Sequence, residues 1–348
     1  DGGGAMFSTV KSAAYVHETV FRSNESQMGG GAVYDHATNT SDGCGTVYES
    51  CYFEGNHGDG MGGAARSYYS DGVRFSDCRF IGNVADEGGA VNNEQSSPSF
   101  ERCRFTSNEA ASGGGMDNYV ASPSLINCTF YDNRTTGSDG GAMRNSAASS
   151  PVVVNCTFLA NDSFGSGGAV YCSNSPMSFA NCVFWNDTAS TSGAEFYLDA
   201  SSGSTIDHSV YDPAKVSGTL TPTSCHNLDP KLSDAANGGM SLTASSPCID
   251  AGTSAGAPSN DIEGRSRDAV PDIGAYEYDS ASQKVWYVRA AAVGSNTGAN
   301  WDNAFADLQD ALAVAQSGDE VWVAAGTYYT GLSAASQKIG RASCRERV

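Results

Sequence analysis

Hydrophobic residues in the first 190 positions recur at an interval far longer than the periods of a helix or a strand. A phenylalanine followed three positions later by asparagine occurs six times, in steps of 25 to 32 residues, and a seventh copy carries Asp187 in place of the asparagine. A cysteine stands two positions before each of the last six phenylalanines, so each Cys and Phe point to the same face of a short strand. The repeated residues are Cys51, Cys78, Cys103, Cys128, Cys156 and Cys182; Phe21, Phe53, Phe80, Phe105, Phe130, Phe158 and Phe184; and Asn24, Asn56, Asn83, Asn108, Asn133 and Asn161.

A second motif, Gly-Gly-(Ala or Gly)-apolar, has the same period and predicts a turn in every repeat. Paired glycines suit a turn that needs a positive φ or a close approach of neighbouring backbones. Three positions before each repeated cysteine stands a further apolar residue, which breaks the strand alternation and therefore predicts a corner or bulge. The glycine motifs begin at Gly3, Gly30, Gly62, Gly88, Gly113, Gly140 and Gly167.

Each unit of about 25 to 28 residues is thus expected to hold two or three short strands and no helix. Short strands that recur at a fixed period cannot bury their apolar face alone, and they do so by stacking on the next repeat. Equivalent residues then lie about 4.8 Å apart, so Phe stacks on Phe, Cys on Cys and Asn on Asn. The sequence predicts an all-β fold, a parallel β-helix.

These paired repeats resemble the polymorphic outer membrane protein repeat family. That resemblance implies a right-handed parallel β-helix in a bacterial protein exported to the outer-membrane surface or beyond the cell. It covers roughly residues 1–190 and does not specify an activity.

The repeat weakens after residue 191, and the following segment resembles the closing module of choice-of-anchor Q proteins, which would cap the open end of the β-helix. After a polar linker, a strand, an amphipathic helix over 306–315 and a second strand resemble the N-terminal cap and first coil of another β-helix. The last eleven residues, KIGRASCRERV, look like a translated sequencing adapter. The expected divisions are 1–191 (repeats), 192–278 (degenerate coils and closing module), 279–284 (linker), 285–337 (head of the second β-helix) and 338–348 (adapter).

Composition narrows the possible partners. The chain carries 39 acidic against 19 basic side chains, a net charge of −20, which disfavours nucleic acid and anionic lipid. No apolar run approaches the ~18 residues of a membrane helix, so no membrane span is expected. No phosphate loop or nucleophile motif is found, and no cofactor is predicted.

The sequence weakly indicates two sites, a Ca²⁺ site and a catalytic site, and each has a simpler interpretation. Acidic residues near the glycine turns are candidate Ca²⁺ ligands, although a solvated acidic face explains them better, because no copy has the spacing of a calcium loop. A group of charged residues on two adjacent repeats, which includes Arg102, has the arginine base and the carboxylates that a polysaccharide lyase needs. The simpler interpretation of this group is a surface ion-pair cluster. The cysteine ladder is expected to be a row of buried thiols, and Cys225 could pair with Cys248. The Ca²⁺ candidates are Asp59, Asp86, Glu87 and Asp139; the lyase candidates are Asp77, Arg79, Glu101 and Arg104.

The sequence therefore favours a secreted or cell-surface β-helix scaffold that contacts a polysaccharide or a surface protein without catalysis. The alternative is a carbohydrate-active enzyme, a lyase or hydrolase on uronate-containing polymers. A hydrolase needs two or three carboxylates clustered on a cleft, and no such cluster is expected within the repeats. The ligand and the oligomeric state stay open.

Overall fold

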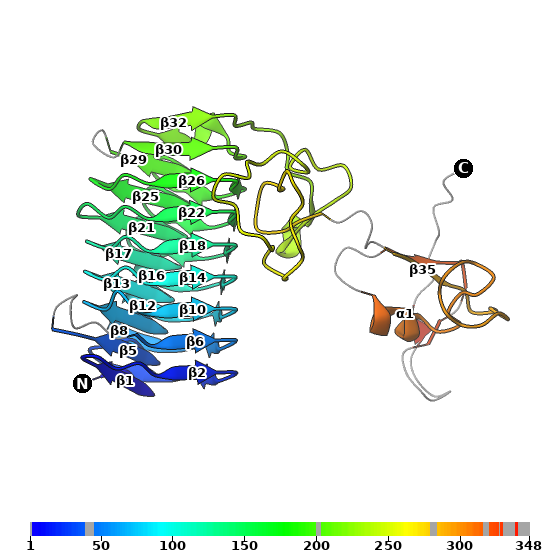
Figure 1. Ribbon diagram of the computed structural model, residues 1–348, viewed down its shortest axis with the longest axis horizontal. Coiled ribbons are helices and arrows are strands. Elements are labelled where there is room, and N and C mark those ends of the chain that lie inside the picture. Colours follow the sequence, from blue (N-terminus) through cyan, green and yellow to red (C-terminus); the bar gives the residue numbers. More distant parts are fainter. Residues whose placement is uncertain are drawn as a thin grey trace. The chain divides into compact units, whose positions relative to one another are not determined.

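Each repeat folds into one coil of up to four short strands, and the coils stack into a parallel β-helix (Figure 1). The computed structural model describes residues 2–38, 45–199, 203–278, 284–315, 320–326, 328–329 and 338–339. They belong to two compact units, Asp1–Glu277 and Tyr278–Val348. The predicted all-β fold is confirmed in the first unit.

Sheet A is formed by the strand that follows the glycine motif of each coil. Its register aligns the apolar residue after the glycines with its counterpart in the next coil, so those residues point inward together. The strands are β1 (Met6–Thr9), β5 (Val33–His36), β9 (Ala65–Tyr68), β13 (Val91–Glu94), β17 (Met116–Tyr119), β21 (Met143–Ser146), β25 (Val170–Ser173), β29 (Phe196–Leu198) and β31 (Val216–Ser217).

Sheet B holds the apolar residue that precedes each repeated cysteine. Its strands are β2 (Tyr15–His17), β6 (Val47–Glu49), β10 (Arg74–Ser76), β14 (Ser99–Glu101), β18 (Ser124–Ile126), β22 (Val152–Val154), β26 (Ser178–Ala180), β30 (Ser204–Asp207) and β32 (Leu220–Thr223).

Sheet C begins directly after each cysteine and carries the repeated phenylalanine. Its strands are β3 (Val20–Arg22), β7 (Tyr52–Glu54), β11 (Arg79–Ile81), β15 (Arg104–Thr106), β19 (Thr129–Tyr131), β23 (Thr157–Leu159) and β27 (Val183–Trp185). The corner expected between sheets B and C lies at the residue before the cysteine, which adopts a positive φ, for example 54° at Asp77 and 52° at Asn127.

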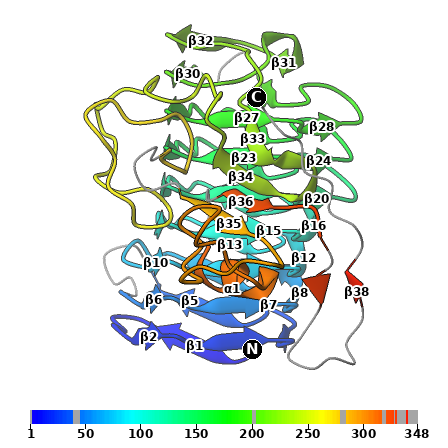
Figure 2. The same cartoon turned by 90° about the vertical axis from the view of Figure 1, so that its right-hand side faces the viewer.

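Sheet D follows the repeated asparagine and gives regular coils a fourth strand, where the sequence predicted two or three strands per coil. These strands bury at most one or two small residues, such as Ala85 in one coil and Ala110 with Ser112 in the next, which leaves almost no hydrophobic pattern to recognise. Figure 2 shows several of these strands one above another. They are β4 (Glu25–Ser26), β8 (His57–Met61), β12 (Val84–Glu87), β16 (Glu109–Ser112), β20 (Arg134–Thr135), β24 (Asp162–Ser163) and β28 (Thr188–Ala189).

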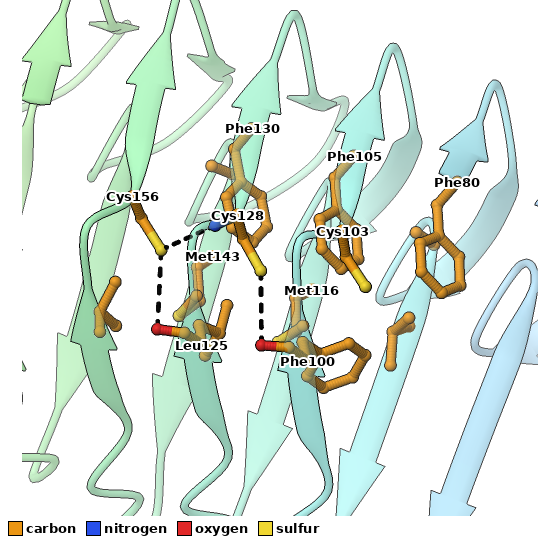
Figure 3. Close-up of a cluster of buried hydrophobic side chains, with 14 of the residues drawn as sticks. Phe80, Phe100, Cys103, Phe105, Met116, Leu125, Cys128, Phe130, Met143 and Cys156 are labelled. Carbon is orange, nitrogen blue, oxygen red and sulfur yellow. Dashed lines mark hydrogen bonds between the residues drawn. The ribbon is translucent and has the colours of Figure 1, made fainter. Parts of the chain in front are cut away.

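The interior consists of stacked identical side chains. The rings of Phe105 and Phe130 lie 4.5 Å apart with an interplanar angle of 2°, and the other repeated phenylalanines stack in the same way (Figure 3). The repeated cysteines are buried free thiols whose Sγ atoms face backbone carbonyls, as Cys128 faces the carbonyl of Phe100 at 3.5 Å. Cys225 and Cys248 are free thiols as well, whereas Cys44 and Cys344 lie outside the described residues.

The segment after the last coil packs along the flank of the solenoid. It contains one short 3-10 turn, η3 (Ala235–Asn237), and one hairpin of β33 (Leu232–Asp234) and β34 (Gly239–Leu242), whereas η2 (Pro213–Lys215) lies within the coils, just before β31. Asn155 donates from Nδ2 to the carbonyl of Asp272, and Asn181 donates to the carbonyl of Thr253. These hydrogen bonds run to the corner asparagines on the side of the coils, and the expectation that the module caps the open end stays a prediction.

The second unit pairs β35 (Val285–Val288) in parallel with β36 (Glu320–Val323) and packs α1 (Leu308–Val314) nearby. Val288, Phe305, Ala311 and Tyr328 form its small core. Two further strands, β37 (Tyr328–Tyr329) and β38 (Lys338–Ile339), pair antiparallel. The start of a second β-helix stays a prediction. Of the expected adapter segment, only Lys338 and Ile339 belong to the described residues. None of the helices in the described part of the chain is long and apolar enough to cross a membrane.

Candidate functional site

The outer surface of sheet A carries two rows of aromatic and charged side chains. In each strand the residue after the buried apolar position points outward, and the parallel register places these residues in line along the solenoid. We call these two rows the sheet A face. The first row is Phe7, Tyr34, Arg66, Asn92, Asp117, Arg144, Tyr171 and Tyr197, and the second is Thr9, His36, Tyr68, Glu94, Tyr119, Ser146 and Ser173.

A cleft of about 340 Å³ opens in the middle of the sheet A face. Four of its lining residues come from the two rows, and the other two come from the last residues of strands in sheet D. The cleft thus lies at the corner where the chain passes from sheet D through the glycine turn into sheet A. Its lining residues are Met61, Glu87, Asn92, Glu94, Tyr119 and Arg144.

A buried carboxylate fixes the arginine of the cleft. Arg144 donates from Nη1 to Oδ1 of Asp117 at 2.9 Å, and the Asp117 side chain has no exposed surface. Asn92 donates from Nδ2 to the other carboxylate oxygen at 3.4 Å. Burial raises the pKa of Asp117 to about 6, although the charge of Arg144 opposes that shift. The arginine is therefore held by an ion pair whose strength depends on pH.

A second ion pair borders the same cleft. Arg66 donates from Nη2 to Oε2 of Glu94 at 2.8 Å and from Nη1 to the carbonyl of Met28 at 2.9 Å. The guanidinium carbon of Arg66 also lies 5.1 Å from the ring centre of Tyr34 and 5.3 Å from that of Tyr68. Such contacts over aromatic faces favour the charged guanidinium. The contacts of Arg66 thereby hold Glu94 at the edge of the cleft.

Several polar atoms beside the cleft have no hydrogen-bond partner among the described residues. They are Oδ1 of Asn92 and the Nε atoms of Arg144 and Arg66. Leaving such a group unpaired costs about 1–3 kcal/mol, so each is usually matched by water or a ligand.

Aromatic rings extend the sheet A face on both sides of the cleft. On one side His36 stacks on Tyr68 with ring centres 5.4 Å apart and an interplanar angle of 2°. On the other side Tyr171 stacks on Tyr197 at 5.0 Å and 4°. The face therefore combines a polar centre with stacked aromatic rings at both ends.

The lyase candidates lie together on adjacent coils, as the repeat alignment implied. Arg79 and Arg104 occupy paired outward positions of β11 and β15. Asp77, however, accepts two hydrogen bonds from Arg102 at 2.8 Å, and Glu101 pairs with the same guanidinium. Both carboxylates are thus engaged in an ion-pair network and are not free to hold a metal.

The four Ca²⁺ candidates do not share one site. Glu87 lines the cleft, and Asp139 accepts a hydrogen bond from the backbone N–H of Ser166 at 2.7 Å. Asp59 lies near His57 and Glu25, and ligand atoms of these three exposed residues fall within 4.8 Å of one another. Asp86 is exposed on β12.

The expectation that the repeats hold no catalytic cluster of carboxylates on a cleft stays a prediction. Glu87 and Glu94 line the cleft, and their charges raise the pKa of the buried Asp117 further. None of these residues belongs to a repeated motif. Alignment of the coils on the glycine motif would have placed Glu94 and Asp117 on one outward face.

The comparisons agree with this architecture. The family described as "Right handed beta helix region" matches residues 38–211, which is half of the chain. The chain belongs to this family of right-handed β-helix proteins. A search of curated proteins finds no match to the sequence.

Proposed function

We propose that the chain is a cell-surface or secreted bacterial scaffold that binds a glycan along the sheet A face without cleaving it. The observation that carries the proposal is the cleft of about 340 Å³, with partnerless polar atoms beside it and stacked aromatic rings on either side. Ligand sites in proteins combine apolar walls with a few fixed polar groups in this manner.

The chemistry of the face suits sugar rings. The half-exposed ring of Tyr119 offers contact to the C–H surface of a pyranose, while the guanidinium of Arg144, which is partly exposed, offers hydrogen bonds to its hydroxyls. The rigid backbone of the stacked coils holds these groups at a fixed spacing, which reduces the entropy lost on binding.

Binding is favoured over cleavage because two of the three carboxylates at the cleft, Asp117 and Glu94, are engaged in ion pairs, which leaves Glu87 without a second free carboxylate beside it. Asp117 is fully buried behind Arg144, and Glu94 is held by Arg66. A general acid or base must reach the glycosidic oxygen or a water molecule beside it. A buried and an ion-paired carboxylate are better suited to orienting two arginines than to transferring protons.

A glycan array followed by calorimetric titration of the best glycan tests this proposal. We expect Arg144→Ala and Tyr119→Ala to weaken binding at least tenfold. Arg134→Ala is the matched control, because Arg134 is an exposed ion-paired arginine of sheet D and its loss should leave binding unchanged. Equal loss in all three variants, or binding of no glycan by the folded chain, would overturn the proposal.

Cleavage of a uronate-containing polymer is the second candidate function, since Glu87, Glu94 and Asp117 surround an arginine in the cleft. It is tested by incubating the chain with pectic and alginate polymers, with and without Ca²⁺, and by measuring new reducing or unsaturated ends. Activity lost in Glu94→Gln would place an enzyme in the cleft. Activity lost only in Arg79→Ala or Arg104→Ala would place it on sheet C.

A further inference from the structure

The asparagine ladder inside the β-helix has a fixed hydrogen-bond pattern at every regular rung. Asn133, for example, donates from Nδ2 to the carbonyl of Phe105 in the preceding coil and to Oδ1 of Asn161 in the following coil. Its own Oδ1 accepts two hydrogen bonds from Asn108. Each rung therefore needs an acceptor on one side and an N–H donor on the other. The same pattern holds at Asn56, Asn83, Asn108 and Asn161.

The last rung is Asp187, which has no amide to donate. Its Oδ1 accepts the backbone N–H and the Nδ2 group of Asn161, both at 2.8 Å, as an asparagine would. Its Oδ2 takes the place of the amide nitrogen, is buried and has no partner among the described residues. An ionised carboxylate is a poor substitute there, because the position calls for a donor.

The next coil brings a second buried carboxyl to the same place. Glu195 occupies the position that Ala169 holds one coil earlier, because Val170 and Phe196 are paired in sheet A. Its Oε2 accepts the backbone N–H of Asp212 at 2.6 Å, whereas its Oε1 has no hydrogen bond and the residue is fully buried. The charges of Asp187 and Glu195 are close enough that each disfavours ionisation of the pair.

The charged groups around this pair do not balance two negative charges. Lys215 lies with Nζ 3.6 Å from Oε1 of Glu195, and its side chain is one third exposed. Asp212 adds a further negative charge beside Glu195, and Tyr211 packs nearby as a neutral phenol. One ammonium group offsets one carboxylate, so ionisation of both would leave an uncompensated charge in the interior.

We propose that the pair Asp187 and Glu195 retains one proton that closes the last coil of the β-helix, residues 188–199 and 203–217, and that loss of this proton loosens the coil. On Asp187 the proton supplies the donor that the ladder lacks at its final rung. The coil includes β28, β29, β30 and β31, so its loosening would free the terminal strands of sheets A and D.

The direction of the pH dependence follows from burial. Desolvation raises the pKa of Asp187 to about 7 and that of Glu195 to about 8, while Lys215 opposes both shifts. The folded coil therefore binds more protons than the unfolded chain between about pH 4, where free carboxyls titrate, and pH 8. The stability of the last coil should fall as pH rises through this range and level off above it.

Hydrogen exchange of the full chain, corrected for intrinsic exchange rates, tests the proposal. We expect amide protection in β29 to fall at least tenfold between pH 6.0 and 8.5, while protection in β17 stays constant as the internal reference. Asp187→Asn restores the residue of every other rung and should reduce the fall to less than twofold. Glu195→Gln should do the same.

Either of two results would overturn the proposal. One is equal protection of β29 at both pH values in the wild-type chain. The other is a fall in Asp187→Asn and Glu195→Gln as large as that of the wild type, which would assign the pH dependence to other groups. Because Asp187→Asn introduces the ladder's own residue, we expect this variant to fold.

Discussion

At the scale of single residues, the buried asparagines contribute to stability through hydrogen bonds that no apolar residue can replace. Asn133→Ala removes four hydrogen bonds and leaves groups of Asn108 and Phe105 without these partners in the interior, whereas Oδ1 of Asn161 keeps the backbone N–H of residue 133. We expect the free energy of unfolding to fall by about 3–5 kcal/mol, since each buried unpaired group costs about 1–3 kcal/mol. Chemical denaturation measures this. Arg134→Ala, one position along the chain and exposed, should cost at most about 1 kcal/mol; equal losses would contradict the argument.

The raised pKa of Asp117 predicts that glycan binding depends on pH. Because the pKa of Asp117 is raised to about 6, its carboxylate is ionised at pH 7.5 and largely neutral at pH 5. At pH 5 it no longer holds Arg144 by charge, so we expect binding to weaken several-fold. Calorimetric titration at both pH values measures the effect. In Asp117→Asn the two affinities should agree, and a persistent difference would exclude Asp117 as its origin.

At the scale of elements, the glycine turns set the distance between coils. A Cβ atom on Gly89 would lie 2.2 Å from the carbonyl oxygen of Gly114 in the next coil. The N–H of Gly89 is bonded to Gly113 at 3.0 Å, so the turn cannot move away without losing that bond. Gly89→Ala should therefore lower the melting temperature by many degrees or prevent folding.

Gly82→Asn is the matched control for this turn. Gly82 has a φ of +60°, which asparagine tolerates, and a Cβ atom there would meet nothing within 4 Å. Its melting temperature should stay within a few degrees of the wild type. A comparable loss in both variants would show that the turn conformation, and not the approach of the coils, limits stability.

The sequence predicts those elements whose residues repeat. Phe105 and Phe130 stack because the same residue returns at the same position of each coil, and the period alone indicates it. The cleft depends on the opposite property, since Asn92, Asp117 and Arg144 hold equivalent outward positions but differ in chemistry. A search for repeated motifs discards such positions. The hydrophobic pattern of the sequence did not predict the strands of sheet D, because these strands bury so few and such small residues.

At the scale of the whole first unit, the segment after the coils is locked to the flank by contacts that sequence spacing cannot reveal. Arg267 donates to Glu277 at 2.7 Å and to Oδ1 of Asn127, which lies 140 positions earlier. Both partners of the ion pair are almost fully buried. The corner asparagine belongs to the repeat, but nothing in its spacing indicates which later residue binds it.

Removal of the Arg267 side chain tests whether these contacts hold the segment on the flank of the coils. Arg267→Ala leaves Glu277 buried without its counter-charge, and we expect a loss of about 3–5 kcal/mol in the free energy of unfolding. Limited proteolysis should then cut within residues 253–277 before it cuts the coils. Arg265→Ala is the control, because Arg265 forms a more exposed ion pair with Glu263. Unchanged proteolysis of Arg267→Ala would show that the contacts of Arg267 do not hold the segment on the coils.

The central claim is that the sheet A face binds a glycan. Footprinting by hydrogen exchange, with and without the best glycan from the array, tests it most directly. We expect protection to appear on β13, β17 and β21, around the cleft, and to be absent from sheet C. Protection on sheet C without any on sheet A would contradict the account.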